Sequence, residues 1–178
     1  MKRISLLILI ILPIVKLFGQ SENRLHFIGI TPSITVEPYY NSGELDINIL
    51  PLVYQRTINE RIDLRATSIL NYGIREGNDK ISHFGLETAV PFFFKRKEDK
   101  SNLSKGFYLA PVFSFTRNKE AEHSNIGLWI EPGYNLLFDN EFAMSFGLQL
   151  GGTYFNYDNQ TNTWGNHFGF KIIFGKWI

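Results

Sequence analysis

Apolar residues alternate with small or polar residues along most of this chain. The clearest stretch covers residues 142–153. Its apolar side consists of Phe142, Met144, Phe146, Leu148 and Leu150, and its other side of Ala143, Ser145, Gly147, Gln149, Gly151 and Thr153. A repeat of two residues predicts a β-strand with two chemically different faces, because successive side chains of a strand point to opposite sides.

Eight such stretches follow one another, and polar turns or loops separate them. We expect strands at about residues 26–37, 44–56, 61–72, 82–94, 107–115, 124–138, 142–153 and 168–175. The connections at one end are 57–61, 95–106 and 138–141, and those at the other end are 40–43, 73–81, 117–123 and 155–166. An even number of antiparallel strands, most of ten or more residues, predicts an all-β fold, an eight-stranded up-and-down barrel.

The beginning of the chain predicts export. Lys2 and Arg3 precede an apolar run at residues 4–15, and residues 16–20 close it. A helix that crosses a bilayer needs roughly 20 apolar residues, so this run predicts a signal peptide. We therefore expect a signal peptide at 1–20 and one barrel domain at 21–178. An exported barrel of this kind is expected in the bacterial outer membrane, with the second set of connections outside the cell.

The composition of the two faces indicates which one points outward. The polar face is rich in Gly, Ala, Ser and Thr, which fit the narrow interior of an eight-stranded barrel. The other face carries no charge at the middle of any strand, and in water it would be a very large exposed apolar surface. We expect it to face lipid. The alternative is a soluble periplasmic barrel of the lipocalin type, in which the apolar face points inward.

Aromatic residues gather near both predicted ends of the strands. The group near the external end is Tyr39, Tyr40, Tyr72, Tyr154, Tyr157 and Trp164. The group near the periplasmic end is Phe92, Phe93, Phe94, Phe107, Phe138, Phe142 and Trp177. Two such girdles are typical of barrels that cross a bilayer.

Five prolines fall within the predicted strands and oppose the pattern. They are Pro32, Pro51, Pro91, Pro111 and Pro132. Proline cannot donate a ladder hydrogen bond, and a closed barrel has no free edge to accommodate the loss. We expect bulges or strand ends at these positions, with the register around them undetermined.

The polar face also carries charges, which we expect to form a network that plugs the lumen. The members are Glu37, Asp46, Asp63, Arg65, Glu87, Glu131 and Lys171. Charges inside a narrow barrel need partners, because isolated burial is prohibitive. The alternative is a path for protons or ions through a narrow pore or transport component.

Few residues suggest chemistry. His123 and Ser124 raise a lipid A-modifying enzyme as an alternative, but neighbours on a regular strand point to opposite faces and cannot form a nucleophile–base pair. No cysteine, metal-ligand cluster or phosphate loop is present in the sequence. With 18 basic against 17 acidic residues, no basic field favours nucleic acid. We expect a non-enzymatic protein without a cofactor.

The mature chain resembles the small outer-membrane β-barrel proteins, the porin-like group that includes the OmpA transmembrane domain and OmpX. The resemblance rests on the pattern of faces from about residue 25 onward and on the last strand. There His167, Gly169, Ile172 and Phe174 match the spacing of the signal read by the barrel-assembly machinery, although residues 175–178 follow where a terminal aromatic is usual. The resemblance implies outer-membrane lipid, the assembly machinery and envelope proteins as partners, and a structural or surface-interaction role.

Overall fold

The computed structural model describes residues 26–35, 42–77, 80–95, 103–119 and 122–178. These residues form β-strands and no helix. None of the described segments is a helix with the length and hydropathy needed to cross a bilayer. The predicted signal peptide at 1–20 and the lumen residue Glu37 lie outside the described residues.

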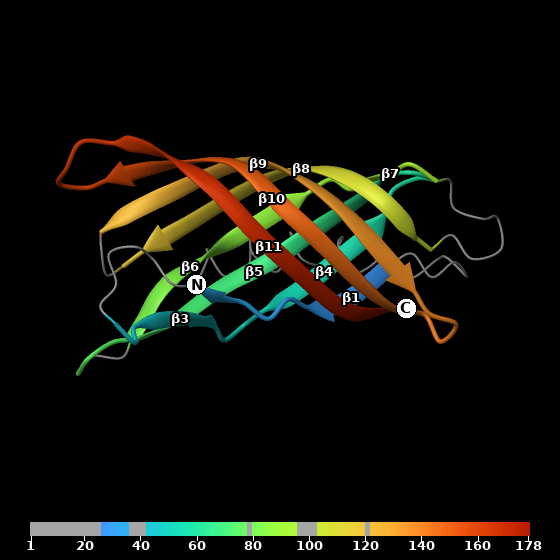
Figure 1. Cartoon of the computed structure of the whole chain (residues 1–178), viewed down its shortest axis with the longest axis horizontal. Helices are drawn as coiled ribbons and strands as arrows, with labels where there is room; N and C mark the ends of the chain where they lie inside the picture. The colour runs from blue at the N-terminus through green and yellow to red at the C-terminus, as the bar shows by residue number, and fades with distance from the viewer. Residues whose placement is uncertain (1–25, 36–41, 78–79, 96–102, 120–121) are drawn as a thin grey trace, which may run out of the picture.

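Eleven strand segments make up the eight strands of an antiparallel, up-and-down barrel (Figure 1). The first four strands contain the segments β1 (His26–Ile30) and β2 (Ile34–Thr35), β3 (Leu45–Asn48) and β4 (Leu52–Thr57), β5 (Asp63–Ile74), and β6 (Lys80–Ala89) with β7 (Phe92–Phe93). The last four are β8 (Gly106–Asn118), β9 (His123–Leu137), β10 (Phe142–Tyr157) and β11 (Thr163–Trp177). Pairing of β1 with β11 joins the first strand to the last and closes the ring.

The barrel has two distinct ends. The turn end contains the β9–β10 turn, together with His26 of β1 and Trp177 of β11. The loop end contains the β10–β11 connection, the red hairpin at the left of Figure 1. These two names are used below.

Apolar side chains point outward and small or polar ones inward, as the alternation predicted. In β8 the side chains of Phe107, Leu109 and Phe113 are exposed, whereas Tyr108 and Ala110 between them are buried. The arrangement is the reverse of a barrel of the lipocalin type. Small inward residues allow this, because eight strands leave little room in the centre.

Three of the five prolines lie at interruptions between strand segments, as expected. Pro32 separates β1 from β2, Pro51 separates β3 from β4, and Pro91 separates β6 from β7. Val53 continues the apolar repeat of Leu45, Ile47 and Ile49, which predicts an outward side chain, but beyond the break at Pro51 it is buried inside the barrel. The reason is a tight turn, in which the Leu52 amide donates to the Leu50 carbonyl at 2.9 Å.

The other two prolines contradict the expectation, because Pro111 lies within β8 and Pro132 within β9. In both places the neighbouring ladder is interrupted instead. The Pro111 carbonyl accepts from Val90 in the break between β6 and β7. Pro132 lies where β9 and β10 lose pairing between the Gly147–Gly133 and Leu150–Ile130 pairs, with no change of register. The amide hydrogen that each proline lacks is therefore not needed, because the neighbouring strand makes no ladder hydrogen bond at that position.

The hairpin at the loop end is longer than the sequence predicted. We expected a polar connection at 155–166, but β10 continues to Tyr157 and β11 begins at Thr163. Tyr154 pairs with Trp164 across the two strands, and their ring centroids lie 5.2 Å apart. Cross-strand aromatic pairs stabilise a hairpin, and they extend it here through a stretch that is polar in composition.

Candidate functional site: the barrel lumen

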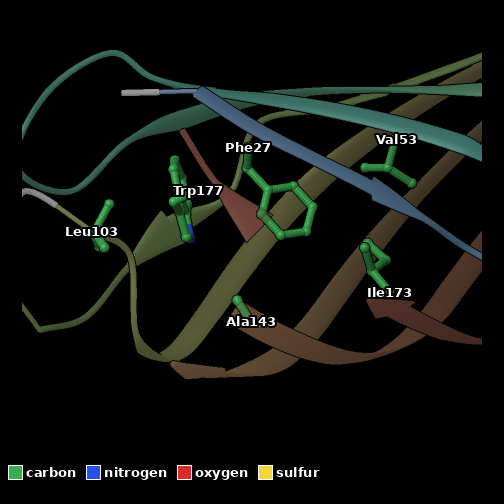
Figure 2. Close-up of a cluster of buried hydrophobic side chains, with 6 residues drawn as sticks. All are labelled: Phe27, Val53, Leu103, Ala143, Ile173 and Trp177. Atoms are coloured by element: carbon green, nitrogen blue, oxygen red, sulfur yellow. The ribbon is translucent and has the colours of Figure 1, made fainter. Parts of the chain in front are cut away.

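The turn end of the lumen is filled by apolar side chains (Figure 2). The cluster consists of Phe27, Val53, Leu103, Ala143, Ile173 and Trp177. The rings of Phe27 and Trp177 lie 5.5 Å apart between centroids. Trp177 and Phe93 were predicted in an outward girdle, but both are buried inside. We name the six residues of the cluster in Figure 2, which does not include Phe93, the turn-end plug.

The connection before β8 takes part in this closure. Leu103 belongs to the turn-end plug, and the next residue, Ser104, is fully buried. The Ser104 hydroxyl donates to the Asp63 carboxylate, which also accepts from Gln55 Nε2 at 2.6 Å. Asn135 Nδ2 donates to the Ser104 carbonyl at 2.5 Å. The predicted connection 95–106 is long for its side of the barrel, and the described end of it folds inward to seal that side.

A charged network crosses the middle of the lumen. Arg65 Nη2 on β5 lies 2.6 Å from Glu131 Oε1 on β9, and both side chains are buried. The Tyr108 hydroxyl donates to the same oxygen at 2.7 Å, and Gln149 Nε2 donates to Glu131 Oε2 at 2.9 Å. Charge-assisted bonds of this kind compensate for the loss of water around a buried carboxylate.

The network continues toward the loop end through Glu87. Gln149 Nε2 also lies 3.1 Å from Glu87 Oε2, and Lys171 forms an ion pair with Glu87. Gly147 leaves room for this arrangement, because a Cβ atom there would lie 2.8 Å from the Glu131 side chain. We name Arg65, Tyr108, Glu131, Gln149, Glu87 and Lys171 the central network.

A separate polar cluster lies nearer the loop end. Asp46 is buried, and its Oδ1 lies 2.8 Å from Arg75 Nη2 while its Oδ2 lies 3.2 Å from His83 Nδ1. Asn118 Nδ2 lies 2.9 Å from the other ring nitrogen of His83. A bulge at Ser82 shifts the pairing of β5 with β6 and turns both Ser82 and His83 inward.

Beyond the central network the lumen opens into a cavity of about 540 Å³. This volume lies within the range of small-molecule sites, roughly 300–1,000 Å³. Trp129 and His167 stack on its wall with ring centroids 3.9 Å apart. Four of its lining residues, Thr67, Asn71, Asn125 and Trp129, carry a buried side-chain atom without a hydrogen-bond partner in the described part of the chain.

The structure brings together four of the residues predicted for the lumen network. Arg65, Glu131, Glu87 and Lys171 belong to the central network, whereas Asp63 lies at the turn end and Asp46 in the cluster nearer the loop end. The sequence analysis missed Tyr108, Gln149, Arg75, His83 and Trp129 as members of lumen clusters or of the cavity wall. Inward position could have indicated Tyr108 and Gln149. Arg75 lies in a stretch that we assigned to a loop.

The residues considered for catalysis lie apart from this network. His123 is buried beside the rings of Phe155 and Tyr157, while Ser124 Oγ accepts from Arg117 Nη1 at 3.2 Å. Among the described residues no group of His, Cys, Asp and Glu could hold a metal ion. In the proposed assembly signal, His167 and Gly169 line the cavity, and Ile172 and Phe174 pair with Phe146 and Met144 of β10.

The loop end also carries an exposed ion pair. Both terminal guanidinium nitrogens of Arg117 donate to the Asp158 carboxylate, Nη1 at 2.9 Å. These hydrogen bonds from Arg117 lower the pKa of Asp158 below its ordinary value. The pair connects the end of β8 to the β10–β11 connection.

Comparison of the chain with protein-family models, with curated proteins and with solved structures gave no match. The functional argument therefore rests on the barrel and its lumen.

Proposed function

We propose that the protein is an integral barrel of the bacterial outer membrane with a non-enzymatic, structural or surface-interaction role. The observation that carries the proposal is the outward apolar surface. Residues such as Leu86, Phe113, Phe115, Leu128 and Ile130 are all exposed on neighbouring strands. A continuous apolar surface of this size suits hydrocarbon as its surroundings, because soluble monomers rarely expose patches beyond a few hundred Å².

The interior supports a barrel that does not conduct ions. All six side chains of the turn-end plug are buried. In the central network, Arg65 forms an ion pair with Glu131 and Lys171 forms one with Glu87. The cavity lies on the loop-end side of this network. With the turn end toward the periplasm, the cavity and the loop-end connections face the exterior, where surface lipid, ligands or envelope proteins can meet them.

The first experiment is heat-modifiable migration on a gel. The mature chain would be refolded into phosphatidylcholine vesicles and compared with and without boiling. We expect the unboiled protein to migrate differently from the boiled one, because a closed barrel resists the detergent. A chain that stays in water as a folded monomer and leaves the vesicles empty contradicts the proposal.

Conductance in planar bilayers separates the plugged barrel from the narrow pore. We expect no steady open steps from the inserted protein. Regular steps that persist at constant voltage would contradict the plugged lumen and favour the pore or transport component. Lipid A from expressing cells, compared by mass, tests the enzyme: a change that depends on Ser124 would contradict the non-enzymatic role.

A further inference from the structure

The barrel wall is incomplete on one side of the loop-end half. The pairing of β1 with β11 ends at Ile30 and Phe174. Beyond it, β2 pairs only with β3 among the described strands. On its other side, by contrast, β11 is paired with β10 all the way to Thr163 at the loop end. We name residues 31–34 and 168–171, which border this gap on its two sides, the seam.

Pro32 explains why the two strands separate. It has no amide hydrogen to offer β11. The backbone bonds of its neighbours lead away from β11: the Thr31 amide donates to the Pro51 carbonyl at 2.8 Å, and the Ser33 carbonyl accepts from Asn48 at 3.2 Å. The first strand therefore stays with the second strand and leaves β11.

The cavity reaches the seam from inside. If the register of β1 and β11 continued, Ser33 would oppose Lys171 and Ile34 would oppose Phe170. Residues 31–34 and 168–171 all line the cavity. They include Ile34, Phe168 and Phe170, whose side chains also belong to the outward apolar surface. The cavity and that surface are thus continuous at the seam.

Exposure of the aromatic residues at the seam agrees with this opening. Phe168 is 75% exposed and Phe170 is 62% exposed, compared with 46% for Phe113 and 47% for Phe115, which are paired with both β6 and β9. A neighbour across the ladder covers part of the outward side chains on β8. At the seam the described residues provide such a neighbour only on the β10 side, where Leu150 pairs with Phe168 and Leu148 with Phe170.

The unsatisfied polar atoms indicate the chemistry that fits inside. The charged side chains near the cavity already have partners: Glu87 forms an ion pair with Lys171, and Asp46 forms one with Arg75. The atoms without a hydrogen-bond partner belong to neutral side chains: the Thr67 hydroxyl, the side-chain amide oxygens of Asn71 and Asn125, and the Trp129 indole nitrogen. Thr67 is only 3% exposed. Hydroxyl groups match such a set, because they both donate and accept.

From the seam and the neutral cavity together, we propose that the lumen binds an amphiphile that enters sideways from the membrane. Its uncharged, hydroxyl-bearing head lies in the cavity beside Thr67 and Trp129, and its apolar chain passes the seam between Ile34 and Phe170. This inference rests on the proposed membrane location. It also accounts for the open backbone edge of β11, since irregular or unpaired backbone at membrane depth is tolerated only where it lines a polar cavity or protein.

The test uses a single cysteine as a reporter, because the chain contains none. Ser114→Cys places a thiol on the cavity wall, and Ala143→Cys places one in the turn-end plug as a control. Each variant would first be refolded into phosphatidylcholine vesicles. Dodecylmaleimide would then be added, and the added mass would be measured over time. We expect the Ser114→Cys protein to be labelled and the Ala143→Cys protein to stay unlabelled.

A second substitution narrows the seam. A Cβ atom on Gly169 would lie 3.1 Å from both Gln149 Oε1 and His167 Nε2, so Gly169→Leu fills the inner side of the seam after small side-chain movements. We expect it to slow labelling by dodecylmaleimide about tenfold or more and to leave labelling by a short water-soluble maleimide unchanged. The control is Thr88→Leu on β6, outside the lining of the cavity, which should slow neither reagent.

Protection identifies the occupant. We expect dodecanoylglycerol in the vesicles to slow labelling of the Ser114→Cys protein, and glycerol in the water or dodecane in the bilayer to have no effect. Equal protection by glycerol alone would overturn the membrane source and indicate a soluble polyol. A heat-modifiable, inserted barrel whose Ser114→Cys thiol does not react with dodecylmaleimide, or reacts equally after Gly169→Leu, overturns the inference. A chain that does not insert contradicts the proposed function instead.

Discussion

Arg65 and Glu131 meet across the lumen, from strands β5 and β9, which are not neighbours in the barrel. Their side chains are 1% and 0% exposed, and 2.6 Å separates Nη2 from Oε1. The pair therefore joins two sides of the wall through the centre. Removing one partner of a buried pair leaves an uncompensated charge, which is more costly than replacing both.

We expect Arg65→Met to destabilise the folded barrel by about 3–5 kcal/mol, the usual cost of breaking a buried pair. The double variant Arg65→Met with Glu131→Leu should recover most of the loss, since it removes both charges. Urea unfolding in phosphatidylcholine vesicles gives the free energies for a double-mutant cycle. If the single and double variants lose the same stability, the pair is not coupled in the folded protein.

Facing can be tested on β8 with two adjacent residues. Phe113 points outward and Ser114 points into the cavity. We expect Phe113→Arg to cost about 2–4 kcal/mol, as a charge on the lipid face near the middle of a bilayer does. Ser114→Arg should cost clearly less, because its guanidinium group can remain in the polar cavity. Equal losses in vesicle unfolding experiments would mean that the faces are assigned wrongly.

The alternation of residues was sufficient to predict the fold and most of the facing, because the side chains of a regularly paired strand point alternately into the lumen and outward. It failed where backbone geometry departs from a regular ladder. Val53 is turned inward by the break at Pro51, and no spacing rule gives the size of that break. Pro111 and Pro132 lie inside strands because the ladder beside them is interrupted, a fact that belongs to the neighbouring strand.

The sequence predicts which residues face the lumen better than it predicts which of them contact one another. Inward position marked Arg65, Glu131, Glu87 and Lys171, but the strand tilt and stagger of the closed barrel decide which of them meet. The seam depends on the same geometry, since it arises from where the first strand leaves the last. Girdle position did not predict the burial of Trp177, because aromatic residues at a strand end can point to either side.

Trp177 provides a prediction about the turn-end plug. Its side chain is 1% exposed and packs against Phe27. We expect Trp177→Ala to cost about 3–5 kcal/mol, the usual range for a large aromatic residue removed from a core. Phe138→Ala, at the same end but 46% exposed on the outside, is the control and should cost less. Similar losses for the two variants would place Trp177 in a lipid-facing girdle after all.

The exposed pair at the loop end predicts the acid behaviour of one carboxylate. Hydrogen bonds from Arg117 lower the pKa of Asp158 from its ordinary 3.8. A carboxylate whose pKa is lower in the folded state than in the unfolded state stabilises the fold above the unfolded pKa. That contribution disappears as the pH falls through the folded pKa, so the window lies below about pH 4.

We expect Arg117→Gln to return the pKa of Asp158 toward 3.8, measured from the carboxyl carbon shift of labelled aspartate in a pH titration. The stability of the barrel at neutral pH should change little, because exposed ion pairs contribute weakly. Lys119→Gln is the control: Lys119 is the first residue after the end of β8, and its replacement should leave the titration of Asp158 unchanged. An Asp158 curve that is identical in the wild-type and Arg117→Gln proteins would show that the two side chains do not pair in solution.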